Sequence, residues 1–123
     1  MTAKLYTIAP QLVVPDVVEA AQYYEKFYGF ENLGYFADPP VYGMVRRDGA
    51  MIHFGQSKQP PNTNRAVRPG SFDAYIWVDD IHALHEEFVN RGANILEGPV
   101  ERIYGRTEVI VQDLNGYTIA FGQ

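Results

Sequence analysis

The sequence predicts an α+β domain made of two tandem βαβββ modules, whose strands form a curved, cup-shaped mixed sheet with the helices outside. Three repeated features support this prediction. The tripeptide Phe-Gly-Gln closes an apolar strand pattern twice, at residues 54–56 and 121–123. A turn of the Asp-Gly or Asn-Gly type precedes each of these strands. A valine–aspartate pattern leads into a helical pattern in each half, and such repetition indicates one supersecondary unit written twice.

The first module covers about residues 5–56. Leu5 to Val14 is apolar and β-favouring, and Pro10 within it suits a strand edge or a bulge. Asp16 is predicted to cap a helix whose apolar residues recur at helical spacing, and Gly29 is predicted to end that helix. Three further strands are expected, the last two as a hairpin: 30–36, 41–47 and 50–55.

The second module covers about residues 71–123, after a linker at about 57–70 that is rich in proline and asparagine. Asp79-Asp80 is expected to open its helix and Gly92 to follow it. The remaining predicted elements are a strand at 72–78, a short strand at 93–96, a loop at 97–105 and a closing hairpin from Thr107 to Phe121. Each unit is too small to be stable alone and needs its partner, so we expect one domain over residues 1–123.

Composition limits the classes of function. The 123 residues are 46% hydrophobic and 20% charged, which is typical of a globular domain. The net charge of −5 argues against general nucleic-acid or anionic-membrane partners. There is no cysteine, so disulfide and thiol chemistry are excluded. There is also no apolar run near 18 residues and no signal-peptide pattern, so a soluble cytoplasmic protein is expected.

The duplicated pattern is accompanied by further short motifs, which are Phe27-Tyr28-Gly29-Phe30, Tyr104-Gly105, Glu108, Asp113, Asn115-Gly116 and Phe121-Gly122. Together these features resemble the vicinal oxygen chelate superfamily, which includes glyoxalases, bleomycin resistance proteins and extradiol dioxygenases. The resemblance covers essentially the whole chain and is closest to the short bleomycin-resistance-like branch. Leu114 departs from it, because the family usually has proline there. The resemblance implies the paired-module fold and usually a homodimer with cavities inside the cups, but it does not fix the reaction.

The resemblance also implies where a metal would bind. Metal-using relatives take one ligand from each of four inward-facing positions, which here are Ala9, His53, Asp73 and Ala120. Alanine cannot be a ligand, and a catalytic divalent site normally has at least three protein ligands. We therefore expect no complete catalytic metal site and no other cofactor. If a divalent metal does bind, His53 and Asp73 would hold it, with Glu108, Gln11 or substrate oxygens completing the shell.

Strand alternation suggests which side chains line a ligand cavity. Asp73, Tyr75 and Trp77 fall on one face of their strand, opposite the face expected to pack on the helix. A carboxylate beside aromatic rings on a concave wall fits ligand binding. The predicted ligand-binding set is Gln11, Tyr42, His53, Asp73, Tyr75, Trp77, Tyr104 and Glu108.

Each charged candidate also has a structural interpretation. His53 would then be a hydrogen-bonded lining residue, Asp73 a solvated strand start, and Glu108 the ion-pair partner of Arg102 or Arg106.

Three functions remain open. The first is a binding protein similar to drug-sequestering bleomycin resistance proteins, which would hold a small cationic or aromatic ligand in an acidic aromatic cavity. The second is a divalent-metal-dependent lyase or dioxygenase that uses His53 and Asp73. The third is a metal-free isomerase in which His53 and either Asp73 or Glu108 form the proton-transfer pair. Whether the protein is an enzyme is left open, and these three residues are the catalytic candidates.

Overall fold

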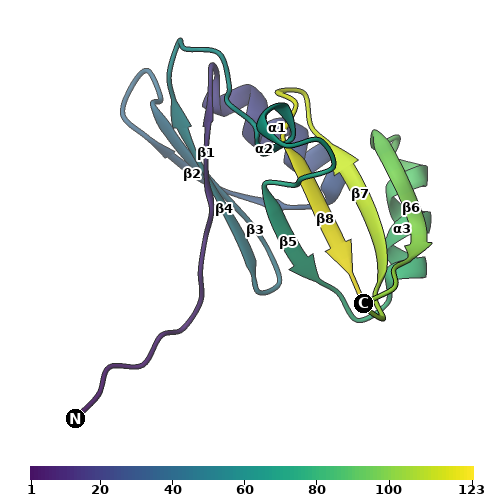
Figure 1. Ribbon diagram of the computed structural model, residues 1–123. Helices are drawn as coiled ribbons and strands as arrows, with labels where there is room; N and C mark the ends of the chain where they lie inside the picture. The colour runs from purple at the N-terminus through teal and green to yellow at the C-terminus, as the bar shows by residue number, and fades with distance from the viewer.

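Two βαβββ modules follow one another along the chain in the computed structural model, which describes residues 1–123 (Figure 1). The first module contains β1 (Gln11–Val14), α1 (Val17–Tyr28), β2 (Glu31–Phe36), β3 (Tyr42–Arg47) and β4 (Ala50–Gln56). The second contains β5 (Ala74–Trp77), α3 (Ile81–Arg91), β6 (Ile95–Glu101), β7 (Thr107–Gln112) and β8 (Thr118–Gly122). The short helix α2 (Asn64–Val67) lies between them. The predicted duplication is confirmed.

The strands form two four-stranded mixed sheets. Sheet A has the order β1-β4-β3-β2 and sheet B the order β5-β8-β7-β6. In each sheet the first strand of the module runs parallel to the last, and the other neighbours are antiparallel. No strand of one sheet pairs with a strand of the other, so each module contributes one sheet of the predicted fold. The outer edges of β1 and β5 are therefore left without a neighbour.

The predicted helix ends are confirmed. The Asp16 carboxylate accepts hydrogen bonds from the amides of Val18 and Glu19, and Asp80 caps α3 in the same way. Gly29 and Gly92 end the two helices in the left-handed conformation, with φ of 72° and 78°. None of the helices has the length and apolarity required to span a membrane.

One apolar core joins the modules. Helix α1 packs on sheet A, α3 packs on sheet B, and the two helices contact each other. Aromatic rings pack across the contact between the two modules. The ring centroids of Tyr28 in α1 and Phe88 in α3 are 5.5 Å apart, and those of Phe88 and Phe121 in β8 are 5.1 Å apart. Arg47 of β3 also donates two hydrogen bonds to Glu87 of α3. The modules are thus held together by packing and by charge.

Two predicted boundaries were wrong. The first strand begins at Gln11 rather than at Leu5, because residues 1–10 have no neighbouring strand with which to pair. The loop predicted at 97–105 is strand as far as Glu101, since β6 continues past Gly98-Pro99 through register shifts that absorb the irregular residues. The linker holds the single turn of α2, which Thr63 caps.

Candidate functional site

Each sheet has one face covered by its helix and one open face. On sheet B the helix-packed face carries Val109, Ile119 and Phe121. Because side chains alternate along a strand, the open face carries Tyr75 and Trp77 of β5, with Glu108 of β7. Tyr75 lies opposite Ala120 in the ladder, while Trp77 and Glu108 both lie opposite Gly122. The predicted face assignment of Tyr75 and Trp77 agrees with the packing of Ala74 and Ile76 against the core.

Glu108 is the centre of a polar cluster on this open face. Its Oε2 accepts hydrogen bonds from the hydroxyl groups of Tyr75 at 2.8 Å and Tyr104 at 2.7 Å. Its Oε1 accepts one from Arg102 Nε at 2.9 Å, and Arg102 also pairs with Glu97. The Glu108 side chain is only 1% exposed. Burial raises the pKa of this carboxyl, but the hydrogen bonds from Tyr104, Arg102 and Tyr75 outweigh burial and hold the pKa below its ordinary value. Glu108 is therefore a buried carboxylate that stays ionised.

Gly122 makes room for this cluster. A Cβ at Gly122 would lie 1.8 Å from the Tyr75 hydroxyl oxygen, which no real contact allows. Only glycine lets the Tyr75 ring lie across β8 and reach Glu108. The glycine of the second Phe-Gly-Gln ending is thus part of the site.

Aromatic rings cover the buried carboxylate. Trp77 is 67% exposed, and its ring lies against that of Tyr75 with centroids 4.8 Å apart. Tyr104 is 60% exposed beside them. Burial and then the hydrogen bond to Glu108 raise the pKa of Tyr75 to about 12, so its phenol remains neutral and keeps donating. The open face of sheet B therefore presents solvent-exposed aromatic rings next to the buried, ionised carboxylate of Glu108.

A second polar group lies on the open face of sheet A. The Tyr42 hydroxyl lies 2.8 Å from His53 Nδ1 and accepts a hydrogen bond from Gln11 Nε2 at 3.0 Å. His53 Nε2 lies 3.2 Å from the sulfur of Met51. The structure therefore brings together three of the predicted ligand-binding residues, but on a different sheet from the Glu108 cluster.

Asp73 belongs to neither group. Its Oδ1 accepts a hydrogen bond from the Asn64 amide at 2.8 Å, and its Oδ2 accepts one from the Thr118 amide at 2.9 Å. The carboxylate thus ties the linker to the start of β8. Alternation along the predicted strand could not reveal that backbone amides of distant segments would occupy both oxygens.

The donor set does not fit the metal site of metal-using relatives. His53 lies on sheet A, whereas Asp73 lies at the start of β5 in sheet B with both oxygens bound to amides. Nowhere do three or more His, Cys, Asp or Glu side chains come together as a potential metal site. His53 also makes no hydrogen bond to Asp73 or Glu108 in one chain, so the proposed proton-transfer pair is not assembled there.

Arg102 is absent from the predicted site residues except as a possible ion-pair partner. The β6–β7 hairpin brings it to Glu108, since Glu101 pairs with Thr107 and Arg102 follows directly. Reading residues 97–105 as a loop concealed this pairing. A hairpin assignment there would have placed the guanidinium beside the carboxylate.

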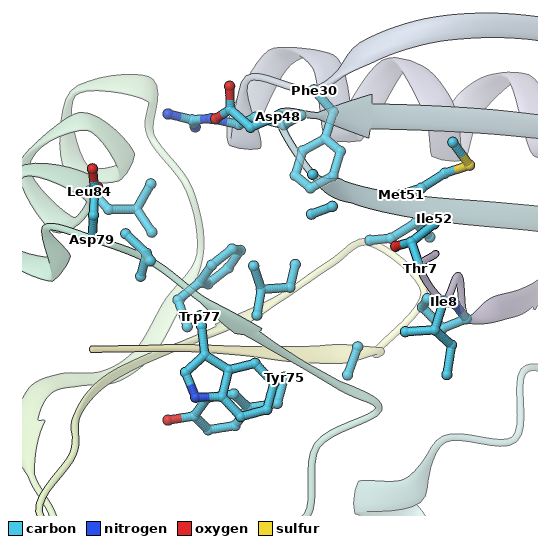
Figure 2. Close-up of a pocket in the computed structure, with 18 residues that line it drawn as sticks. Thr7, Ile8, Phe30, Asp48, Met51, Ile52, Tyr75, Trp77, Asp79 and Leu84 are labelled. Carbon is cyan, nitrogen blue, oxygen red and sulfur yellow. The ribbon is translucent and has the colours of Figure 1, made fainter. Parts of the chain in front are cut away.

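A largely apolar cleft of about 610 Å³ opens between the two modules, and Tyr75 and Trp77 form part of its lining (Figure 2). Most of its lining consists of hydrophobic side chains, which come from the start of β4, from β5 and from the region around α3. Among them are Phe30, Ile52, Ile76 and Leu84, with Ile8 from the N-terminal segment at one side. The cleft is continuous with the core, and its few polar lining groups include Arg47, Asp48 and Asp79.

Comparisons with known proteins agree with this architecture. The family profile described as Glyoxalase/Bleomycin resistance protein/Dioxygenase superfamily matches residues 5–121. A search of curated proteins finds no match to the chain.

Solved structures share the fold over nearly their whole length. TioX from Micromonospora sp. ML1 is 17% identical with a TM-score of 0.75, covering 96% of this chain and 98% of that one. A bleomycin-binding protein complexed with bleomycin is 19% identical with a TM-score of 0.75, covering 97% and 98%. A virulence protein from Salmonella typhimurium is 25% identical with a TM-score of 0.70, covering 100% and 98%.

Proposed function

Because the chain belongs to the Glyoxalase/Bleomycin resistance protein/Dioxygenase superfamily, we propose that it is a bleomycin-resistance-like protein that binds a small aromatic cation on the open face of sheet B. The observation that carries this proposal is the exposed Trp77 ring, which lies against Tyr75 with the ring planes tilted by 51°, while the Tyr75 hydroxyl donates to the buried, ionised Glu108. An exposed aromatic pair offers a planar ligand a stacking surface, and such a surface is strongest for a cation.

The charges of the cluster favour the cation. Two carboxylates, Glu97 and Glu108, share one guanidinium, Arg102, so this ion-paired group carries a net charge of about −1, which the nearby Arg106 partly offsets. Aromatic ring faces above it are attractive to positive charge as well. A neutral planar ligand would use the stacking surface alone and should bind more weakly.

The solved neighbour in complex with bleomycin supports small-molecule binding as the role, since it has the same fold. Metal-free binding is proposed on the donor set: Ala9 and Ala120 cannot be ligands, and both oxygens of Asp73 already accept hydrogen bonds from backbone amides. We also propose that a homodimer is the ligand-binding unit, because both open faces are bare in a single chain.

Tryptophan fluorescence tests the proposal directly, because Trp77 is the only tryptophan. The chain would be titrated with bleomycin, with N-methylquinolinium as a planar cation, and with neutral quinoline of similar shape. We expect saturable quenching by at least one cation and weaker binding of the neutral analogue. Addition of a metal chelator should leave the apparent affinity in this titration unchanged.

Calorimetry with Trp77→Leu then measures the aromatic contribution, and Tyr35→Phe on β2 is the control for an exposed ring outside the site. We expect a loss of about 10-fold in affinity for Trp77→Leu and no change for the control. Fluorescence and calorimetry that show no binding of bleomycin or of the cation would contradict the proposal. A titration that depends on added Mn²⁺ or Zn²⁺ would favour the metal enzyme instead.

A further inference from the structure

Two of the three methionines of the chain lie on the open face of sheet A. Met44 of β3 and Met51 of β4 precede the core residues Val45 and Ile52, so their side chains leave the sheet on the side opposite α1. His53 lies on the same face, two residues after Met51. The register pairs His53 directly with Met44 across the β3–β4 ladder. Two thioethers therefore flank the one imidazole of this sheet.

The imidazole and one of the thioethers are in contact. His53 Nε2 lies 3.2 Å from the sulfur of Met51. Metal bonds of about 2.0 Å to nitrogen and about 2.3 Å to sulfur hold two donor atoms about 3.2–3.5 Å apart when the angle between the bonds is about 95–110°. The two atoms therefore have the separation that two ligands of a single ion require.

Tyr42 and Gln11 hold the histidine ring from its other side. The Tyr42 hydroxyl lies 2.8 Å from His53 Nδ1 and accepts a hydrogen bond from Gln11 Nε2. When the ring proton is on Nδ1, the Tyr42 oxygen accepts it and the Nε2 lone pair is free on the side of Met51. In the other tautomer, Nε2–H makes only a weak hydrogen bond to sulfur. Histidines that bind metals usually donate their second ring N–H to such a neighbour, which orients the ring.

The three donors determine which class of ion fits. Thioethers are soft ligands that select monovalent copper, whereas Mg²⁺, Ca²⁺ and Mn²⁺ prefer carboxylate and carbonyl oxygens. The thioethers and the neutral imidazole carry no charge to balance a divalent ion. Arg46 also faces Met51 across the ladder, and the carboxylate with which it pairs, Glu31, is largely exposed. A single positive charge is repelled less by this guanidinium than a double one.

We propose that Met44, Met51 and His53 form a three-ligand site for a soft monovalent ion, Cu(I) or its analogue Ag(I), and that Tyr42 is a positioning residue for the imidazole. The three side chains are half-buried, so an ion can reach them from solvent while the sheet holds them in place. The site uses two neighbouring strands of one module and neutral donors. It lies on the other sheet from the aromatic surface of Trp77, so it stands independently of the proposed function.

Silver titration tests the site, because Ag(I) has the ligand preferences of Cu(I) and does not change oxidation state in air. The full chain is titrated with silver nitrate in chloride-free buffer, and native mass spectrometry counts the bound ions. We expect one ion per chain. In ¹H–¹³C NMR spectra the methyl signals of Met44 and Met51 should shift together, while Met1 and a parallel titration with Zn²⁺ show no such change. Absence of Ag(I) binding, or a shift of Met1 alone, would overturn the proposal.

Substitutions separate the ligands from the fold. Met44→Leu and Met51→Leu keep the side-chain volume and remove the sulfur, so each should weaken Ag(I) binding by more than about 10-fold. His82→Gln on α3 is the control for an exposed imidazole outside the site and should leave the affinity unchanged. Circular dichroism should be the same for all variants. Unaltered affinity in both leucine variants would show that the His53–Met51 contact is only a hydrogen bond, and the proposal would fail.

The role of Tyr42 has its own spectroscopic test. ¹⁵N NMR of the His53 ring should show that Ag(I) binds Nε2 and leaves the proton on Nδ1. Tyr42→Phe removes the acceptor of that proton, so the Nδ1 signal should move and the affinity should fall about 10-fold. An Nδ1 signal that is the same with phenylalanine at this position would show that Tyr42 does not orient the ligand.

Discussion

The two Phe-Gly-Gln endings occupy the same place in their modules, yet their surroundings differ. In both, the glutamine side chain accepts a hydrogen bond from the first amide of the module's helix: Gln56 from Val17 at 3.2 Å and Gln123 from Ile81 at 2.9 Å. The glycines are not equivalent, because a Cβ on Gly55 would have no neighbour nearer than 3.6 Å. The two modules thus share even the hydrogen bond of this glutamine to the helix, whereas the side chains around the two glycines differ.

The turns that precede these endings show the same divergence. Asp48 in the first module is exposed. Asp113 in the second is 6% exposed and accepts hydrogen bonds from the Tyr24 hydroxyl and from the amides of Asn115 and Tyr117. The second module thus carries the buried polar groups, one at the junction with α1 and one beneath the aromatic surface. Both modules have the same backbone arrangement, and the second module carries the buried carboxylates Glu108 and Asp113.

Replacing the aspartates of the two turns, Asp113 and Asp48, should give the largest difference in stability between equivalent positions of the modules. Asp113→Ala leaves a buried phenol and two amides without their acceptor, so we expect the free energy of unfolding to fall by about 3 kcal/mol. Asp48→Asn keeps a residue that tolerates the positive φ of 50° and should change stability by less than about 0.5 kcal/mol. Urea unfolding measures both, and similar losses would show that the turns are equivalent after all.

The two glycines offer a milder contrast. In Gly122→Ala the new methyl group must push the Tyr75 hydroxyl away from Glu108, and we expect a loss of about 1–2 kcal/mol. Gly55→Ala has space for its methyl group and should stay within about 0.5 kcal/mol of the wild type. Thermal unfolding of the pair checks this, and a neutral Gly122→Ala would mean that Tyr75 does not need its position over β8.

The buried turn carboxyl also predicts a pH dependence. Burial raises the pKa of Asp113 to about 6, against the hydrogen bonds from Tyr24, Asn115 and Tyr117. The folded state then binds more protons than the unfolded state between about pH 4 and 6, so this group stabilises the fold at low pH and loses that effect as the pH rises through 6. From pH 7 to pH 5 the gain should be about 1 kcal/mol. Asp113→Asn should remove this component of the unfolding curves, and an unchanged pH dependence would assign it elsewhere.

The smallest effect concerns one phenol. Glu108→Gln removes the carboxylate that helps to raise the pKa of Tyr75 to about 12. The pKa should fall toward the ordinary value of about 10, although burial still keeps it somewhat higher. NMR titration with ¹³C-labelled tyrosine can follow Tyr75, and His53→Gln on the other sheet provides the control that should leave it unaltered. An unchanged value in Glu108→Gln would show that the hydrogen bond contributes little.

Much of the fold could be predicted because its signals are local. The caps at Asp16 and Asp80 and the left-handed glycines at 29 and 92 depend on a few neighbouring residues. The lengths of the first strand and of β6 could not be predicted, because they depend on pairing. Leu5 to Ala9 has the composition of a strand but no partner within the chain, whereas Gly98-Pro99 has the composition of a loop but pairs through a bulge.

The site was predicted unevenly for a similar reason. Alternation placed Tyr75 and Trp77 correctly, since it is a property of one strand. The partners of Glu108 come from β5, from the start of the β6–β7 turn and from that turn itself, so only the folded sheet brings them together. Sequence alone also could not show that Arg102 and two phenols already bind the Glu108 carboxylate.

One long-range contact bears on how the chain reaches this structure during synthesis. The Tyr117 hydroxyl of the closing hairpin donates to the carbonyl of Val13 in β1, across 104 residues. Asp113 reaches Tyr24 of α1 from the same hairpin. The contacts of β1 and α1 are therefore complete only after the closing hairpin has left the ribosome. Contacts between residues far apart in the sequence slow folding. We therefore expect that the first module is not stably folded in a nascent chain that ends before Asp113.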